Sequence, residues 1–145
     1  MNAVTILIVE DEPAHAALIE RNLKRSGVVN DIVKFENGKL ATDYIFSKGD
    51  YTDITHDYSL LILLDINMPV KGGVDVLEEL KRNDKTKEIP VIMLTTTDDQ
   101  TEIDTCYELG CNAYVVKPVE HAKFSEAIKN IGLFVNILAV PTNGV

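Results

Sequence analysis

The fold of this chain is decided by the stretch Leu60-Leu61-Ile62-Leu63-Leu64-Asp65-Ile66-Asn67-Met68-Pro69. Five aliphatic residues run without a break and stop at Asp65. A run this short, followed by Pro69 and the pair Gly72-Gly73, is typical of a strand buried on both faces. Asp65 would then lie at the carboxyl end of a parallel strand, where such sheets bind their ligands. Because Asp also ends strands before ordinary turns, its role depends on what the other strands carry.

Strands and helices alternate five times along the chain. Apolar runs predict strands at residues 4–9, 28–35, 60–65, 90–94 and 113–116. Apolar residues and helix-ending signals predict five helices. They lie at residues 13–25, from 37 to about 45, around Val74, Leu77 and Leu80, around Ile103, Cys106 and Tyr107 with Gly110 as the C-cap, and over residues 124–138. A long polar connection, residues 47–59, precedes the third strand. This alternation predicts an α/β fold, a doubly wound parallel sheet with helices on both faces.

Length and composition fit one domain with an ordinary core. The chain has 145 residues, of which 46% are hydrophobic and 26% charged. Its 23 acidic and 14 basic residues give a net charge of -9, which repels phosphate backbones, so we expect no nucleic-acid binding. No apolar run approaches the roughly 18 residues that cross a bilayer, so we expect no membrane contact. The spacing of Cys106 and Cys111 fits no redox or zinc motif, which favours reduced thiols and a cytoplasmic location.

Polar side chains follow four of the predicted strands. These residues are Glu10 and Asp11, Asp65, Thr95, and Lys117. Parallel strands point their carboxyl ends the same way, so we expect these side chains to converge. Three carboxylates in one crevice would repel one another, and a divalent cation resolves that conflict. Hard oxygen ligands favour Mg²⁺.

A carboxylate in such a cluster can attack phosphorus, because aspartate side chains form aspartyl phosphates. Phosphoryl transfer needs positioning and positive charge around the phosphoryl oxygens. Lys117 and the cation would supply the charge, and the Thr95 hydroxyl could donate a hydrogen bond. Taken singly, Thr95 could be a helix cap and Lys117 a solvated charge. Their occurrence in order at successive strand ends points instead to one site at Asp65.

Four motifs together resemble the receiver domain of bacterial response regulators. They are Val9-Glu10-Asp11-Glu12, Leu64-Asp65-Ile66-Asn67-Met68-Pro69, Met93-Leu94-Thr95-Thr96 and Tyr114-Val115-Val116-Lys117-Pro118. The resemblance implies a flavodoxin-like fold with five strands in the order 2-1-3-4-5 and five helices. It also implies a single receiver domain over residues 1–145, with no effector domain. Such a domain is a two-component signalling protein, not a conventional enzyme, and takes its phosphoryl group from a sensor histidine kinase.

The resemblance also assigns roles to individual residues. Asp65 would be phosphorylated, and Mg²⁺ would be bound by the side chains of Asp11 and Asp65, by the Asn67 backbone carbonyl and, through water, by Glu10. The residues expected to respond to the phosphoryl group are Lys117, which would pair with it, Thr95, which would be drawn towards it, and Tyr114, which would turn inward. Two residues would be structural: the turn glycine Gly73, and Pro118, whose peptide bond with Lys117 would be cis.

Three positions depart from the usual receiver pattern. Glu10 stands where Asp is commoner, Gly72 where Asp often precedes the turn glycine, and Thr96 where a smaller residue is usual. We expect slow self-dephosphorylation, because Thr96 and Thr97 offer no acid or base to orient water.

The C-terminal residues suggest how a stand-alone receiver signals. Apolar residues surround the predicted last helix over residues 131–140, which predicts burial on more than one side. We expect a homodimer contact, and a tail folded over its own domain is the alternative. This tail and the long connection at residues 47–59 are similar to the small response regulators of cyanobacterial phytochromes.

Three other functions fit parts of the pattern. A phosphatase of the haloacid dehalogenase type also combines Asp, Thr, Lys and Mg²⁺, but its Asp-x-Asp-x-Thr motif is absent at Asp65-Ile66-Asn67. A flavodoxin would need a phosphate cradle where Glu10-Asp11-Glu12 stands. A receiver-like interaction module that is never phosphorylated is the third alternative.

Overall fold

Five parallel strands form one sheet. The computed structural model of the chain describes residues 4–55, 57–96, 99–117, 122–123 and 126. The strands are β1 (Thr5–Val9), β2 (Ile32–Phe35), β3 (Leu60–Asp65), β4 (Val91–Thr95) and β5 (Ala113–Val116). They pair in the order β2-β1-β3-β4-β5, which confirms the predicted flavodoxin-like topology.

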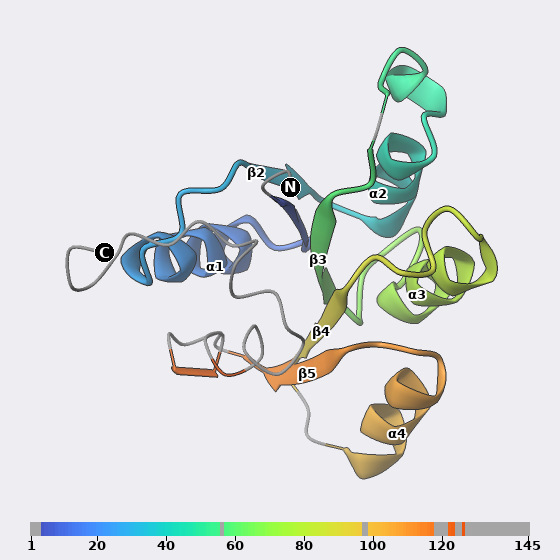
Figure 1. The fold of residues 1–145 in the computed structure, drawn as a ribbon. Coiled ribbons are helices and arrows are strands. Elements are labelled where there is room, and N and C mark those ends of the chain that lie inside the picture. The colour runs from blue at the N-terminus through green and yellow to red at the C-terminus, as the bar shows by residue number, and fades with distance from the viewer. Residues whose placement is uncertain (1–3, 56, 97–98, 118–121, 124–125, 127–145) are drawn as a thin grey trace.

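Helices cover both faces of this sheet (Figure 1). Those in the described residues are α1 (Pro13–Arg25), α2 (Gly38–Ile45), α3 (Gly73–Arg82), α4 (Gln100–Glu108) and a short 3₁₀ helix, η1 (Gly49–Tyr51). Helix α1 lies on one side, and α2, α3 and α4 lie on the other. The predicted helix over residues 124–138 lies outside the described residues apart from Glu126, and every described helix is too short or too polar to cross a membrane.

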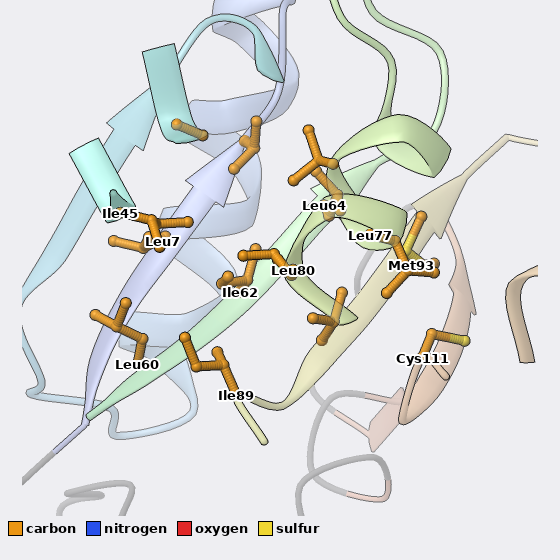
Figure 2. Packing of buried hydrophobic residues seen from close by; sticks show 14 of the residues in the cluster. Leu7, Ile45, Leu60, Ile62, Leu64, Leu77, Leu80, Ile89, Met93 and Cys111 are labelled. Carbon is orange, nitrogen blue, oxygen red and sulfur yellow. The ribbon is translucent and has the colours of Figure 1, made fainter. Parts of the chain in front are cut away.

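The sheet packs into an apolar layer on each face, because alternate side chains of a strand point to opposite sides. One layer joins Ile6, Ile8, Leu61 and Leu63 to Ile19 and Leu23 of α1. The other, shown in Figure 2, joins Leu7, Ile62, Leu64 and Met93 to Ile45 of α2 and to Leu77 and Leu80 of α3. All six residues of β3 are buried, as predicted for the central strand. Each large side chain buried there contributes about 1.5–3 kcal/mol, so the strand that ends at Asp65 is firmly fixed.

The strand predicted at residues 28–35 is shorter than expected. Regular pairing begins only at Ile32. Gly27 adopts a left-handed conformation (φ 89°) after α1, and the Val28 amide donates to the Leu23 carbonyl. The buried Asn30 side chain then donates to the Val4 carbonyl at 2.7 Å. The first half of the apolar run therefore closes the helix end. It contacts the sheet through an isolated bridge at Val28 and through the Asp31 carbonyl, which accepts from the Ile6 amide, instead of extending the regular pairing of β2.

The polar connection at residues 47–59 contains η1, which the sequence did not predict. Tyr51 of η1 packs against Phe35 and Tyr44, with ring centroids 6.1 and 5.4 Å away. These ring contacts hold the connection against the edge strand β2 and helix α2. Cys106 and Cys111 are buried and free, which confirms the reduced thiols, and burial raises the pKa of Cys111 to about 12.

Candidate functional site

The register of the sheet brings the polar strand ends to one edge. The last strand residues pair across the sheet, Val9 with Leu64, Asp65 with Leu94, and Thr95 with Val116. Glu10 and Lys117 each follow one residue beyond their strand. The Lys117 amide donates to the Thr95 carbonyl at 2.7 Å, which continues the β4–β5 pairing to the edge. The convergence predicted from the strand order is thus a consequence of backbone pairing.

Three carboxylates form a cluster at this edge. Glu10, Asp11 and Asp65 each offer one oxygen, and these oxygens lie within 4.8 Å of one another. Glu10 and Asp65 are buried, and Asp11 is half-buried. The Glu12 amide donates to Glu10 Oε2 at 3.2 Å, which holds the Glu10 side chain at the start of α1. The donor set is made entirely of carboxylate oxygens, which suits a hard divalent cation.

Lys117 supplies a positive charge inside this cluster. Its ammonium forms an ion pair with Glu10 Oε1 and lies 3.4 Å from Asp65 Oδ1. The Lys117 side chain is only 11% exposed, so both contacts are shielded from water. With every group ionised, three carboxylates and one ammonium leave two negative charges uncompensated. A divalent cation would balance that charge, so the residues present fit Mg²⁺.

The negative charge of the cluster contributes to a raised pKa at Asp65. Burial, and next the charge of Glu10, raise the pKa of Asp65 from its ordinary 3.8 to about 6. Lys117 acts in the opposite direction and is outweighed. The ionised form of Asp65 is therefore disfavoured by its surroundings. A group that neutralises the cluster will favour the ionised, nucleophilic form.

A second cluster, of two hydroxyl groups and one carboxylate, joins the end of β4 to β5 and α4. The Tyr114 hydroxyl donates to Glu102 Oε1 of α4 at 3.1 Å, and the Thr95 hydroxyl lies 3.4 Å from the same oxygen. Thr95 is fully buried, and Tyr114 is half-buried. Burial raises the pKa of Tyr114 to about 12, so the phenol keeps its proton. Glu102 thus joins the two residues that the receiver resemblance assigned to a conformational response.

Gly73 permits the close packing of α3 behind Asp65. The Gly73 amide donates to the Ile66 carbonyl at 2.9 Å. A Cβ atom at this position would overlap the Asp65 carbonyl oxygen, so only glycine fits without a backbone shift. Gly73 therefore allows α3 to begin directly against the end of β3. Asn67 is exposed in the loop that joins Asp65 to α3.

The structure brings together most of the residues singled out from the sequence. Glu10, Asp11, Asp65 and Lys117 meet in one cluster, whereas the contacts of Thr95 given above lead away from it towards α4. Pro118, and with it the predicted cis bond, lies outside the described residues.

Two residues of the site were not predicted from the sequence. His15 Nδ1 lies 3.3 Å from Lys117 Nζ, and Glu102 accepts from Tyr114. His15 could have been found, because the first turn of the helix after Glu10-Asp11 begins at the same sheet edge. Glu102 had no comparable signal, since acidic residues are common on exposed helix faces.

Comparison with known proteins gives a family match over most of the chain. A family model for the response regulator receiver domain matches residues 6–129. Response regulator Rcp1 of Synechocystis sp. is 37% identical over 112 residues, which make up 77% of this chain and 75% of Rcp1.

Solved structures agree with this match. Bacteriophytochrome response regulator RtBRR superimposes with a TM-score of 0.86 at 36% identity, covering 98% of this chain and 86% of RtBRR. The Mn²⁺-bound form of Rcp1 superimposes with a TM-score of 0.76 at 32% identity, covering 94% of this chain and 99% of Rcp1. The phosphatase and the unphosphorylated module considered from the sequence are not favoured by these matches.

Proposed function

The chain belongs to the response regulator receiver family, and we propose that Asp65 is the residue on which it accepts a phosphoryl group. The observation that carries this proposal is the position of the Asp65 carboxylate, buried at the end of β3 and 3.4 Å from the Lys117 ammonium. The charge relations among Asp65, Glu10 and Asp11 give a physical reason for the choice. Burial and the charge of Glu10 disfavour the ionised form of Asp65, and added positive charge would favour it.

The phosphoryl group would come from a phosphohistidine of a sensor histidine kinase. In that step the phosphorus–nitrogen bond breaks as a phosphorus–oxygen bond forms to Asp65, and the histidine keeps the bonding electron pair and takes up a proton. Lys117 would donate hydrogen bonds to the phosphoryl oxygens and offset their charge. The family match and the phytochrome-linked relative RtBRR favour a phytochrome-type kinase as the partner.

We further propose that Mg²⁺ binds the three-carboxylate cluster. Asp11 and Asp65 would hold it through side chains, Asn67 through its backbone carbonyl, and Glu10 through water. The ion pair between Glu10 and Lys117 supports the indirect role of Glu10, because that carboxylate already has a cationic partner. The Mn²⁺-bound form of the relative Rcp1 gives further support. When bound, the cation would offset charge on Asp65 and on the incoming phosphoryl oxygens.

The second cluster suggests how phosphorylation changes the surface. A threonine hydroxyl has one proton to donate, so Thr95 can give it to the phosphoryl group or to its partners near α4, but not to both. Drawing Thr95 towards Asp65 would remove one donor from Glu102, and Tyr114, which shares that acceptor, would turn inward. Phosphorylation would then bias the contact surface formed by α4 and β5.

The remaining proposals concern the assembly. The receiver match over residues 6–129 supports treating residues 1–145 as a single receiver domain that signals through protein contacts. We propose a homodimer that uses the C-terminal residues, which lie outside the described part of the chain. The protein would catalyse only phosphoryl transfer to its own Asp65 and the hydrolysis of that phosphoryl group. The hydrolysis would be slow, because the exposed Thr96 side chain offers neither an acid nor a base to orient water.

Acetyl phosphate with and without Mg²⁺ tests the proposal, with the protein's intact mass as the readout. We expect the wild type to gain one base-labile phosphoryl group only with Mg²⁺, and Asp65→Asn to gain none. Asp75→Asn, at an exposed position in the first turn of α3, is the matched control and should behave like the wild type. An Asp65→Asn protein that still takes up the group would refute the assignment.

A further inference from the structure

The ring of His15 lies against the Lys117 ammonium. His15 is the third residue of α1, and its Nδ1 atom is 3.3 Å from Lys117 Nζ although 102 residues separate the two in the sequence. Its Nε2 atom lies 3.4 Å from Glu12 Oε2, and Nδ1 lies 4.0 Å from Glu10 Oε1. The ring therefore spans the space between a surface carboxylate and the buried ammonium.

The chemistry of the two groups fixes the tautomer of the ring. A lysine ammonium carries three donors and no acceptor, so the nitrogen that faces it must offer a lone pair. Nδ1 of His15 is that nitrogen, which puts the ring proton on Nε2. Nε2 faces the Glu12 carboxylate, which is an acceptor, so this contact favours the same neutral tautomer as the contact with Lys117. The result is a chain of polar contacts from Lys117 through His15 to Glu12.

This chain completes the surroundings of the Lys117 ammonium. The three N–H bonds have three acceptors in the described residues: Glu10 Oε1, Asp65 Oδ1 and His15 Nδ1. With two of the protons held by Glu10 and His15, the third is directed at Asp65. Without His15 the ammonium would have one restraint fewer and could rotate about its terminal bonds. Orientation matters here because phosphoryl transfer relies on prepositioned positive charge.

We propose that His15 is a positioning residue for phosphoryl acceptance, holding the Lys117 ammonium with Nδ1 so that one N–H points at the Asp65 oxygen. This inference rests on the proposed function of Asp65. His15 moves no proton and does not touch the phosphoryl group, and it acts only through Lys117. The contact with Glu12 alone would contribute little, because the His15 side chain is 40% exposed. The contact with Lys117, which is 11% exposed, is the one that reaches the site.

The first test compares rates of phosphorylation by acetyl phosphate in Mg²⁺. We expect His15→Ala to slow the reaction about fivefold, the loss of one modest hydrogen bond to a charged group. His15→Asn should recover a rate within about twofold of the wild type, because its side-chain oxygen can accept from Lys117 where Nδ1 did. Arg21→Ala, at an exposed position of the same helix, is the matched control and should keep the wild-type rate.

The second test needs neither metal nor phosphoryl donor. Nitrogen NMR of the His15 ring at about pH 8, where an ordinary histidine is neutral, should show the proton on Nε2. Replacing Lys117 with methionine should shift the Nδ1 signal, because its hydrogen bond is lost. A proton on Nδ1, or an unchanged Nδ1 signal, would overturn the inference.

The outcomes separate this inference from the function on which it rests. If the wild type takes up no phosphoryl group, the proposed function fails and the positioning role fails with it. If the wild type is phosphorylated and His15→Ala keeps pace with it, only the positioning role is wrong. A slow His15→Ala protein that His15→Asn rescues supports both.

Discussion

Two clusters at the same edge of the sheet differ in how their groups are bonded. In the first, Glu10, Asp11 and Asp65 form a carboxylate cluster in which Lys117 pairs with Glu10 and Asp65, and the negative charge exceeds the positive. In the second, the hydroxyl groups of Thr95 and Tyr114 share the acceptor Glu102. The carboxylates of the first cluster repel one another, so binding of a cation or of a phosphoryl group changes the electrostatic free energy of this cluster strongly. The second is held by weak bonds that are easily exchanged, which suits a switch.

The largest effect should follow from removing the Lys117 ammonium from the first cluster. Lys117→Met should slow phosphorylation by acetyl phosphate about 100-fold or more, because a prepositioned charge at the phosphoryl oxygens is lost. The time course of intact mass measures it. Lys39→Met, which breaks an exposed pair with Asp43, is the matched control and should leave the rate unchanged. Equal rates for the two variants would mean that Lys117 does not serve the reaction.

The next largest effect concerns stability without a cation. The pKa of Asp65 is higher in the folded protein than its ordinary 3.8, so the folded chain binds more protons between about pH 4 and pH 6. The contribution of Asp65 to the free energy of unfolding therefore falls as pH rises through that window and stays reduced above it. Asp65→Asn removes this penalty, and at neutral pH we expect it to raise the free energy of unfolding by on the order of 1–3 kcal/mol.

Urea unfolding in the presence of a chelator measures this difference. At about pH 3.5, below both pKa values, the gain should vanish. Saturating Mg²⁺ should also reduce it, because binding stabilises the wild type more than a variant with one ligand fewer. A variant that is less stable than the wild type at neutral pH would show that Lys117 already outweighs the repulsion among the carboxylates.

The sequence predicted where the strands lie, but it did not predict which side chains pair at their ends. Buried apolar runs ending in polar residues predicted β1, β3, β4 and β5, and parallel pairing then made the charged residues converge. The Lys117 pairing with Glu10 was not predicted, because it depends on side-chain reach across strands that are not neighbours. Glu102 was missed for a similar reason. Its role depends on the orientation of α4, which the sequence pattern of one helix does not specify.

A change in the second cluster, Glu102→Gln, should have a smaller effect on the rate of phosphorylation. Glu102→Gln keeps an acceptor oxygen but removes its charge, so Thr95 is held less firmly and is drawn to the phosphoryl group more easily. We expect phosphorylation two- to fivefold faster, about the range of one weakened hydrogen bond. Glu108→Gln, exposed at the end of the same helix, is the control. Slower phosphorylation of Glu102→Gln would mean that Glu102 assists the reaction instead of restraining it.

The smallest effect should appear in the lifetime of the phosphorylated protein. Thr96 is exposed beside the end of β4, and its bulk would restrict the approach of water to the phosphoryl group. Thr96→Ala should therefore change the self-dephosphorylation rate by about two- to threefold towards faster loss, a shift of well under 1 kcal/mol in the barrier. The decay of the phosphorylated mass after the donor is removed measures it. An unchanged lifetime would show that access of water at Thr96 does not set the rate.

The carboxylate at the end of β3, and not its two acidic neighbours, is the proposed acceptor of the phosphoryl group. Borohydride reduces an acyl phosphate to an alcohol and so marks the residue that carried it. After treatment with acetyl phosphate and Mg²⁺, followed by reduction and peptide sequencing by mass spectrometry, we predict the mark at position 65 alone. A mark at Glu10 or Asp11, or none in a protein that has bound Mg²⁺, would contradict the account.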